Sequence, residues 1–369
     1  MSKRNVKRIT VKIGTRVLTD ERNRIDRGVL GDITGQVTDL MDRGIEVILV
    51  SSGAIGAGLG LIEERKKTRS LSELQAIASI GQNHLMDIYN EYLVKKGYIA
   101  GQILLTQEDF NDRKRFLNIR YTLNTLFQYK AVPVINENDS VSTEEIKCGD
   151  NDRLSSLVAD ISKSDLFIVL TDVEGLYDLK GKKIDRVTAV TGDIKTLCRG
   201  KGCEESTGGM LTKLRAVRTA ANAGIPGVIA PGRKKNVIVD IVDGKGIGTS
   251  FEAHKVPLRA RKRWIAFSKK PRGDIMIDEG AEKAIVMRNK SLLSSGVTGA
   301  EGRFSDGDVV NLKASSGAII ARGLSNYTSD EISRIKGRKS GQIEEILGYK
   351  DYDEVIHRDN LVLLDEDDH

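Results

Sequence analysis

The stretch Val132-Pro133-Val134-Ile135-Asn136-Glu137-Asn138-Asp139 decides how the rest of this 369-residue chain is interpreted. Its first four residues are apolar and largely β-branched, which is typical of a strand that is covered on both faces of a sheet. Amides and carboxylates follow at once. In an open α/β sheet, ligands bind just beyond the carboxyl ends of such strands. The stretch therefore predicts a binding site, although Asn and Asp are also common in ordinary turns.

A second polar cluster, Gly149-Asp150-Asn151-Asp152, follows a few residues later and precedes the apolar residues Leu154, Leu157 and Val158. This order predicts that residues 150–152 begin a helix, where side chains act as caps and backbone N–H groups are unpaired. Together the two clusters provide enough amides and carboxylates to hold an ammonium group, a carboxylate or a metal–nucleotide.

Apolar segments of strand and helix periodicity alternate through the first two thirds of the chain. This alternation predicts a mostly parallel sheet with helices on both faces. The expected strands are residues 9–15, 45–50, 99–105, 132–135, 166–170 and finally 226–230, and the expected helices include residues 26–43, 71–94, 113–129 and the segment opened by residues 206–213. Residues 179–205 are charged and contain glycine, and are expected to form a surface excursion.

Three segments have features of phosphate-binding sites. Lys12 precedes Gly14 at the end of the first strand; this is not a Walker A order, and a lysine at a sheet edge is the alternative. Residues 51–58 are a small-residue loop between a strand and an expected helix. They lack G-x-G-x-x-G spacing, so a dinucleotide-binding fold is not expected, and glycines used only for close helix–strand packing are the alternative. The Gly208-Gly209 turn opens a helix with Lys213 on its first turn. A lysine gains nothing from a helix N-terminus, so its position there favours a bound anion.

Composition excludes several other classes of protein. The four histidines are scattered and the three cysteines lack metal-ligand spacing, so neither a histidine-based metal site nor a catalytic triad is expected. No apolar run approaches the ~18–20 residues of a membrane span, and no signal peptide is evident. These features predict a cytoplasmic protein with free thiols. The net charge of +6 mildly favours anionic ligands.

The last third of the chain has a different composition. Residues 256–272 are rich in lysine and arginine around Trp264, which indicates a domain junction. Short strands and glycine turns follow, so a small β-rich domain is expected. Its positive and negative residues nearly cancel, so charge does not indicate RNA binding.

Six motifs in the first part of the chain resemble those of the bacterial glutamate 5-kinases, a branch of the amino-acid-kinase family, and occur in the same order. They are Val11-Lys12-Ile13-Gly14-Thr15, Ser52-Gly53-Ala54-Ile55, Ile135-Asn136-Glu137-Asn138-Asp139, Gly149-Asp150-Asn151-Asp152, Thr171-Asp172-Val173-Glu174-Gly175-Leu176-Tyr177 and Thr207-Gly208-Gly209-Met210 through Lys213. Residues 305–309 and 320–323 resemble the PUA domain of that family. Each motif is weak alone, but six in register are highly specific.

The resemblance implies an α/β amino-acid-kinase fold over residues 1–255, a basic linker over 256–272, and a PUA domain with a C-terminal tail over 273–369. It implies that ATP phosphorylates the side-chain carboxylate of L-glutamate to L-glutamyl 5-phosphate, the first step of proline synthesis. It also implies a need for Mg²⁺, inhibition by proline, and a homo-oligomer formed through the kinase domain. RNA is a further partner that a PUA domain would suggest.

Residue by residue, the resemblance implies three catalytic residues: Lys12, Lys213 and Asp152, with Asp152 orienting the two lysines. The implied ATP-binding residues are Lys12, Gly14, Thr171, Asp172, Thr207, Gly208, Gly209, Met210 and Lys213. The implied substrate-binding residues are Ser52, Gly53, Asn136, Asp139 and Asn151. No direct metal ligand is implied.

The chemistry of this reaction agrees with the residue inventory. A glutamate side chain has a pKa of about 4.3, so at neutral pH it is already an ionised nucleophile and needs no general base. Positioning and charge neutralisation remain, which are the main tasks in phosphoryl transfer. Two alternatives stay open: another amino-acid kinase, acting on acetylglutamate, aspartate, carbamate or UMP, and an RNA-binding protein acting through its PUA domain. Acetylglutamate has no free ammonium group and would have less use for Asp139.

Overall fold

A computed structural model gives the fold and describes residues 6–21, 24–62, 69–141, 150–178, 180–188, 209–254, 260–268 and 271–364. The chain divides into two compact units, Met1–Pro257 and Leu258–His369, and the division falls inside the basic segment 256–272. No helix in the described ranges is both long enough and apolar enough to span a membrane.

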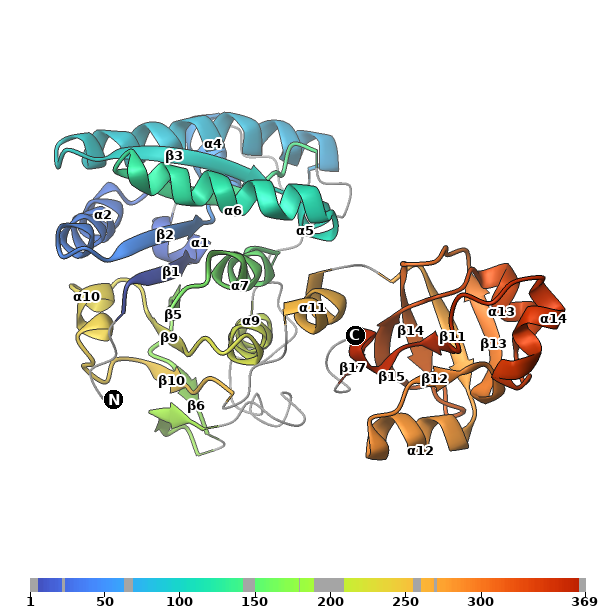
Figure 1. The fold of residues 1–369 in the computed structure, drawn as a ribbon. Coiled ribbons are helices and arrows are strands. Elements are labelled where there is room, and N and C mark those ends of the chain that lie inside the picture. The colour runs from blue at the N-terminus through green and yellow to red at the C-terminus, as the bar shows by residue number, and fades with distance from the viewer. Residues whose placement is uncertain are drawn as a thin grey trace. The chain divides into compact units, whose positions relative to one another are not determined.

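The first unit is built on one sheet, which has eight strands within the described residues, in the order β3-β4-β2-β1-β5-β9-β10-β8 (Figure 1). Its strands are β1 (Arg8–Ile13), β2 (Glu46–Ser51), β3 (Ile99–Leu105), β4 (Ala131–Glu137), β5 (Leu166–Thr171), β8 (Arg186–Val187), β9 (Gly227–Pro231) and β10 (Thr249–Phe251). Neighbouring strands are parallel except β9 and β10. The predicted mostly parallel sheet is therefore confirmed.

Two details of the sheet differ from the prediction. Residues 226–230 are not the final strand, because β10 and β8 extend the sheet beyond β9. The described part of the charged segment 179–205 is not only a surface excursion. It contains β8 and the strand β7 (Lys183–Ile184), which pairs with β6 (Leu176–Tyr177). Pairing of such short strands depends on tertiary contacts that local periodicity does not reveal.

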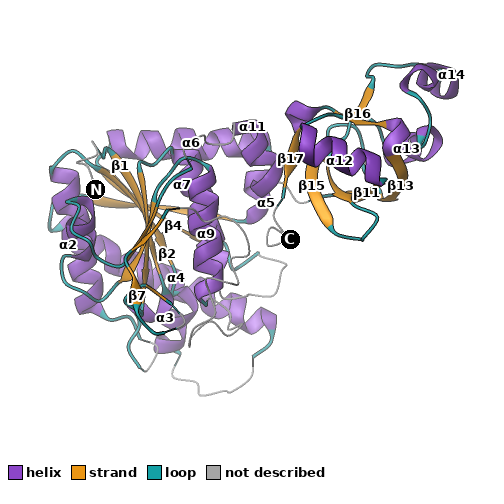
Figure 2. Cartoon of the chain, turned by 90° about the horizontal axis from the view of Figure 1, so that it is seen from below, coloured by secondary structure: helices purple, strands orange, loops and turns teal. Residues whose placement is uncertain are grey.

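Helices cover both faces of this sheet, as predicted (Figure 2). The helices of the first unit are α1 (Thr15–Leu18), α2 (Arg27–Asp42), α3 (Ala54–Leu61), α4 (Leu71–Val94), α5 (Gln107–Asn111), α6 (Arg113–Gln128), α7 (Asp150–Ser162), α9 (Met210–Asn222) and α10 (Val237–Val242). Ile9, Val11 and Ile13 of β1 share a core with α2, α4 and α10. Side chains alternate along a strand, so Thr10 and Lys12 face the opposite layer, where α7 packs against β1 and α9.

The small-residue stretch 51–58 was predicted to be a loop before a helix, and this was wrong in part, because α3 already begins at Ala54. Its glycines allow α3 and α4 to touch backbone to backbone. A Cβ at Gly58 would lie 2.1 Å from the carbonyl oxygen of Ile77, and a Cβ at Gly81 would lie 1.8 Å from that of Ala54. Gly53 is the N-cap of α3 and has a φ of +103°, a conformation that favours glycine, so it allows the turn between β2 and α3.

The second unit is β-rich, as predicted, and it also contains short helices that the sequence analysis did not predict. Its main sheet has the order β13-β11-β14-β15-β17, and β12 pairs separately with β16. The strands are β11 (Gly273–Ile277), β12 (Leu292–Leu293), β13 (Val297–Gly302), β14 (Val309–Lys313), β15 (Ile319–Leu324), β16 (Glu354–Ile356) and β17 (Leu361–Leu363). The α-helices are α11 (Ala260–Arg263), α12 (Glu279–Arg288), α13 (Ser329–Ile335) and α14 (Ile343–Leu347), with 3₁₀ turns at Ser294–Gly296, Ser340–Gln342 and Arg358–Asn360.

The basic segment predicted to be a linker contributes to the core of the second unit. Trp264–Ser268 form a π-helical turn directly after α11. Ile265 and Ala266 are buried there, together with Val309 and Val362. Ile265 and Ala266 therefore attach the second half of this basic segment to the core of the second unit.

Candidate active site

The predicted site residues lie at the ends of parallel strands. β1, β2, β4 and β5 run in the same direction, so their carboxyl ends meet at one edge of the sheet. This edge carries Lys12 from β1 and Gly14 directly after it, Ser52 directly after β2, Asn136 from β4 and Thr171 from β5. α7, which carries Asn151 and Asp152, begins at the same edge. Asp139 lies in the turn directly after β4.

Two lysines from distant parts of the sequence converge on one carboxylate. The Nζ atom of Lys12 lies 2.7 Å from Oδ1 of Asp152, and the Nζ atom of Lys213 lies 3.7 Å from Oδ2. The side chains of Lys12, Lys213 and Asp152 are 7%, 9% and 1% exposed. β1 lies between β2 and β5, so it is not an edge strand, and the alternative interpretation of Lys12 as a lysine on an edge strand was wrong.

The electrostatics of this cluster leave an excess of positive charge. Burial alone would raise the pKa of Asp152, but the charges of Lys12 and Lys213 outweigh it, so this pKa lies below its ordinary value and the carboxylate stays ionised. Burial, helped by the charge of Lys12, lowers the pKa of Lys213, although Asp152 and Asp172 oppose this shift. Two buried ammonium groups therefore share one carboxylate, an arrangement that suits an anionic ligand.

The first turn of α9 is attached to the same carboxylate. Gly209 is the N-cap of α9, and its carbonyl oxygen accepts hydrogen bonds from Oγ1 of Thr212 at 2.9 Å and Nζ of Lys213 at 3.3 Å. Oγ1 of Thr212 also lies 2.6 Å from Oδ2 of Asp152, so its single proton is shared between the two acceptors. Met210 begins the helix, whereas Thr207 and Gly208 lie outside the described residues. Thr212 was not among the predicted site residues, although it lies in the motif that ends at Lys213.

Next to the lysine cluster, amide side chains form a hydrogen-bond network. Nδ2 of Asn151 donates to Oγ of Ser52 and to Oδ1 of Asn136, both at 3.0 Å. Oδ1 of Asn136 also accepts the backbone N–H of Glu137 at 2.9 Å. Nδ2 of Asn136 donates to Oε1 of Gln82 on α4 at 2.8 Å. Three predicted substrate residues are thus brought together, and Gln82, which sequence reasoning missed, joins them.

Gly14 and the carboxyl end of β5 form the other flank of the site. The backbone N–H of Gly14 donates to the carbonyl oxygen of Leu170 at 3.1 Å, which brings the first turn after β1 against β5. Oγ1 of Thr171 donates to Asp172, and Asp172 forms an ion pair with Arg16 at 3.0 Å. Arg16 is a further basic residue at this edge that the sequence did not single out.

The described residues provide no cluster of three or more His, Cys, Asp or Glu side chains that could hold a metal ion. At the site, both oxygens of Asp152 already face lysine or threonine, and Asp172 faces Arg16. This donor set fits a Mg²⁺ ion that is bound mainly by phosphates and water, as Mg²⁺ commonly is in kinase sites.

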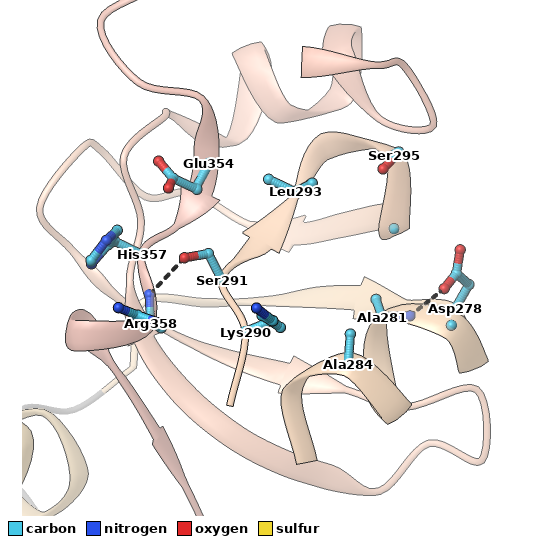
Figure 3. A pocket seen from close by; sticks show the side chains of 12 residues that line it. Asp278, Ala281, Ala284, Lys290, Ser291, Leu293, Ser295, Glu354, His357 and Arg358 are labelled. Carbon is cyan, nitrogen blue, oxygen red and sulfur yellow. Dashed lines mark hydrogen bonds between the residues drawn. The ribbon is translucent and has the colours of Figure 1, made fainter. Parts of the chain in front are cut away.

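A hollow of about 630 Å³ lies in the second unit, between α12, β12 and the segment after β16 (Figure 3). Lys290 and Arg358 line it, but so do Asp278 and Glu354. The backbone N–H of Arg358 donates to Oγ of Ser291 across one side of it at 3.0 Å. The hollow contains none of the predicted site residues, and its charges are balanced.

Comparisons with known protein families match both units. The model of the amino acid kinase family matches residues 7–231, and that of the PUA domain matches residues 273–347. A glutamate 5-kinase from Caldanaerobacter subterraneus subsp. tengcongensis is 47% identical to this chain over 364 residues, which are 97% of this chain and 98% of the relative. A glutamate 5-kinase from Trichlorobacter lovleyi is 45% identical over 97% of both chains.

A comparison with solved structures supports the fold alone. The N-acetylglutamate synthase from Neisseria gonorrhoeae, complexed with coenzyme A and N-acetyl-glutamate, superposes with a TM-score of 0.51 at 13% sequence identity. The match covers 68% of this chain and 60% of that chain.

Proposed function

The chain belongs to the amino acid kinase family, in its glutamate 5-kinase branch, and we propose that it transfers the terminal phosphoryl group of ATP to the side-chain carboxylate of L-glutamate. The products are L-glutamyl 5-phosphate and ADP, and the reaction is the first step of proline synthesis. The single observation that carries the proposal is the convergence of the buried Lys12 and Lys213 on Asp152 at the carboxyl edge of the sheet.

In this mechanism the substrate carboxylate attacks the phosphorus directly. It is ionised at neutral pH, because its ordinary pKa is about 4.3, so the site needs no general base. The main obstacle is repulsion between two anions, the carboxylate and the terminal phosphate. Lys12 and Lys213 neutralise the charge on the oxygens around the transferring group, and Asp152 holds the two ammonium groups in place.

The nucleotide binds, in this proposal, between β5 and the first turn of α9. The first backbone N–H groups of a helix have no partner inside the helix and are suited to phosphate oxygens, and Gly209 and Met210 stand at the start of α9. The proposed nucleotide site also includes Gly14, Thr171, Asp172, Thr207 and Gly208. Bound Mg²⁺, carried mainly by the phosphates, would supply further charge neutralisation.

Glutamate binds, in this proposal, on the other side of the lysines. Its binding site is formed by Ser52, Gly53, Asn136 and Asn151. The hydrogen bonds of Asn151 to Ser52 and Asn136 keep the polar groups of these three side chains oriented. Asp139 supplies a carboxylate for the substrate ammonium group. An ammonium-binding carboxylate is of no use to a kinase of acetylglutamate, so this residue favours a free amino acid.

The experiment is a substrate panel. The purified chain is incubated with ATP, Mg²⁺ and one of L-glutamate, N-acetyl-L-glutamate, L-aspartate, carbamate or UMP. ADP release is measured, and acyl phosphate is trapped with hydroxylamine. L-glutamate should give by far the fastest ADP release together with a hydroxamate. If another acceptor is phosphorylated faster, that acceptor is the substrate instead of L-glutamate. If none of the five acceptors stimulates ADP release, the kinase role is refuted.

We also propose that the first unit forms a homo-oligomer through its β3 edge. Within the described residues, β3 has a neighbouring strand on one side only. Ile99 on β3 is 51% exposed and Tyr121 on α6 is 62% exposed. Figure 1 shows β3 between α4 and α6 at one end of the unit. An unpaired edge strand flanked by exposed apolar side chains is suited to pairing with a second copy of the chain.

The variant Ile99→Lys tests this interface. It should lower the molecular mass measured by light scattering, and an unchanged mass would contradict the proposed interface.

From the resemblance and the composition we further propose that proline inhibits the enzyme and that the protein is cytoplasmic. We also propose the domain limits 1–255, 256–272 and 273–369. Adding L-proline to the glutamate-dependent assay tests the inhibition. RNA binding in the hollow of the second unit is not favoured, because Lys290 and Arg358 share it with Asp278 and Glu354, whereas a polyanion needs a basic face.

A further inference from the structure

The side chain of Gln82 is buried, and its NH₂ group has no hydrogen-bond acceptor among the described residues. It lies on α4 and is 7% exposed. Its Oε1 accepts a hydrogen bond from Nδ2 of Asn136 at 2.8 Å. Its Nε2 is buried and has no hydrogen-bond partner among the described residues. Buried polar groups in proteins nearly always have a partner, so a donor without one in a site region calls for an explanation.

The orientation of this amide follows from a chain of obligatory donors and acceptors. A backbone N–H can only donate, so the N–H of Glu137 requires that Asn136 present its oxygen. Nδ2 of Asn136 must then point to Gln82, which accepts with Oε1. Exchanging the oxygen and nitrogen of Gln82 would bring two NH₂ groups together. The leftover group on Gln82 is therefore a donor, and the partner it lacks is an acceptor.

The order of the strands indicates which part of a bound amino acid this donor would meet. Lys12 lies on β1, Ser52 follows β2, and Asn136 lies on β4, which is the next strand. If the reacting carboxylate lies at Lys12, the rest of the molecule extends across Ser52 towards Asn136 and Gln82. The far end of glutamate carries the α-carboxylate and the α-ammonium group, and only the carboxylate can accept a hydrogen bond.

We propose that Nε2 of Gln82 donates a hydrogen bond to the α-carboxylate of the amino-acid substrate. This inference rests on the proposed function and adds a residue that sets which α-substituent the site accepts. The rival explanation is that Gln82 only supports Asn136 from behind, with no contact to substrate. The two explanations differ in one respect, since a supporting residue does not sense the α-group of the substrate.

The test is Gln82→Glu, assayed with L-glutamate and with L-isoglutamine, in which a carboxamide replaces the α-carboxylate. The introduced carboxylate still offers an oxygen to Asn136, but its charge repels the α-carboxylate of L-glutamate. We expect the KM for L-glutamate to rise about 10- to 100-fold. The ratio of kcat/KM for L-glutamate to that for L-isoglutamine should fall by a similar factor, because a carboxamide can donate to the introduced carboxylate. An equal loss for both substrates would overturn the proposal.

Two further variants complete the design. Gln36 on α2 is also buried, and its Oε1 accepts the backbone N–H of Ile238 at 2.7 Å, away from the predicted site residues. Gln36→Glu therefore controls for a carboxylate at a buried glutamine and should leave the ratio unchanged. If Gln82→Glu does not fold, Gln82→Met should raise the KM for L-glutamate about tenfold with little change in that for ATP. A loss confined to kcat would contradict the contact. A wild-type chain that does not turn over L-glutamate would refute the proposed function instead.

Discussion

Lys12 and Asp152 form an ion pair at 2.7 Å that is almost completely shielded from solvent. The two residues are 140 positions apart in the sequence, one on the central strand β1 and the other at the start of α7. Lys213 lies against the same carboxylate, so Asp152 is a counter-charge that two buried ammonium groups share.

Asp152→Asn should destabilise the first unit strongly. The substitution keeps the shape but leaves two buried cations facing each other, and removing one partner of a buried pair costs about 3–5 kcal/mol. Urea unfolding monitored by circular dichroism measures the loss. Asp240→Asn is the matched control, since its partner Lys245 is exposed and the change should matter little. A loss no larger than that of the control would contradict the central role of Asp152.

Lys213→Ala should leave the fold intact and lower kcat by about 10²–10³-fold, the usual effect of removing one preorganised charge contact. The fold should persist because Lys12 and Asp152 still form a neutral pair. Steady-state ADP release with saturating L-glutamate and ATP gives kcat, and circular dichroism checks the fold. A variant with near-normal kcat would exclude Lys213 from phosphoryl transfer.

Activity should fall at a less alkaline pH than an ordinary lysine would allow. Burial lowers the pKa of Lys213, so its ammonium group loses its proton below the ordinary value of about 10.4. kcat/KM for ATP, which reports the free enzyme, should decrease as the pH rises through this lowered pKa. Lys213→Arg should remove the decrease, because arginine stays protonated. An unchanged profile in this variant would assign the decrease to another group.

The same lowered pKa separates this effect from unfolding. Between the folded and unfolded pKa values of Lys213, the unfolded chain binds more protons than the folded chain. The contribution of Lys213 to the free energy of unfolding therefore rises with pH in that window. Loss of activity caused by Lys213 should accordingly occur without loss of stability.

Asp139→Ala should raise the KM for L-glutamate far more than the KM for ATP. In the proposed site this carboxylate meets the substrate ammonium group and does not contact the nucleotide. Initial rates measured while each substrate is varied at saturation of the other separate the two constants. Equal increases in both KM values would indicate a general disturbance of the site instead of a specific ammonium contact.

Much of this site could be predicted from sequence, for a physical reason. Apolar strands such as Val132 to Ile135 end abruptly in polar residues, and parallel strands bring those ends to one edge. The partners of Gln82 and Thr212 could not be predicted, because their contacts join elements far apart in the chain. The only local signal for Gln82 was that this polar residue lies on the apolar face of α4, at helical spacing from Ala78 and Leu85.

The α3–α4 contact was also missed, and it supports the residues next to it. Gly81 precedes Gln82, and a Cβ there would lie 1.8 Å from the carbonyl oxygen of Ala54 and 2.3 Å from the backbone nitrogen of Gly58. Backbone atoms cannot move aside as a flexible side chain does. Gly81→Ala should therefore lower the free energy of unfolding by about 1–3 kcal/mol, the usual cost of overpacking.

Gly35→Ala provides the matched control for this substitution. Gly35 also lies inside a helix, α2, but a Cβ there would meet no atom within 4 Å. Alanine is the better helix former, so this variant should be more stable by about 0.5–1 kcal/mol. Urea unfolding of both variants gives the comparison. Because Gly81 holds α4 against the start of α3, Gly81→Ala should also raise the KM for L-glutamate, whereas Gly35→Ala should not. Similar stability in the two variants would show that the helices can separate at no cost.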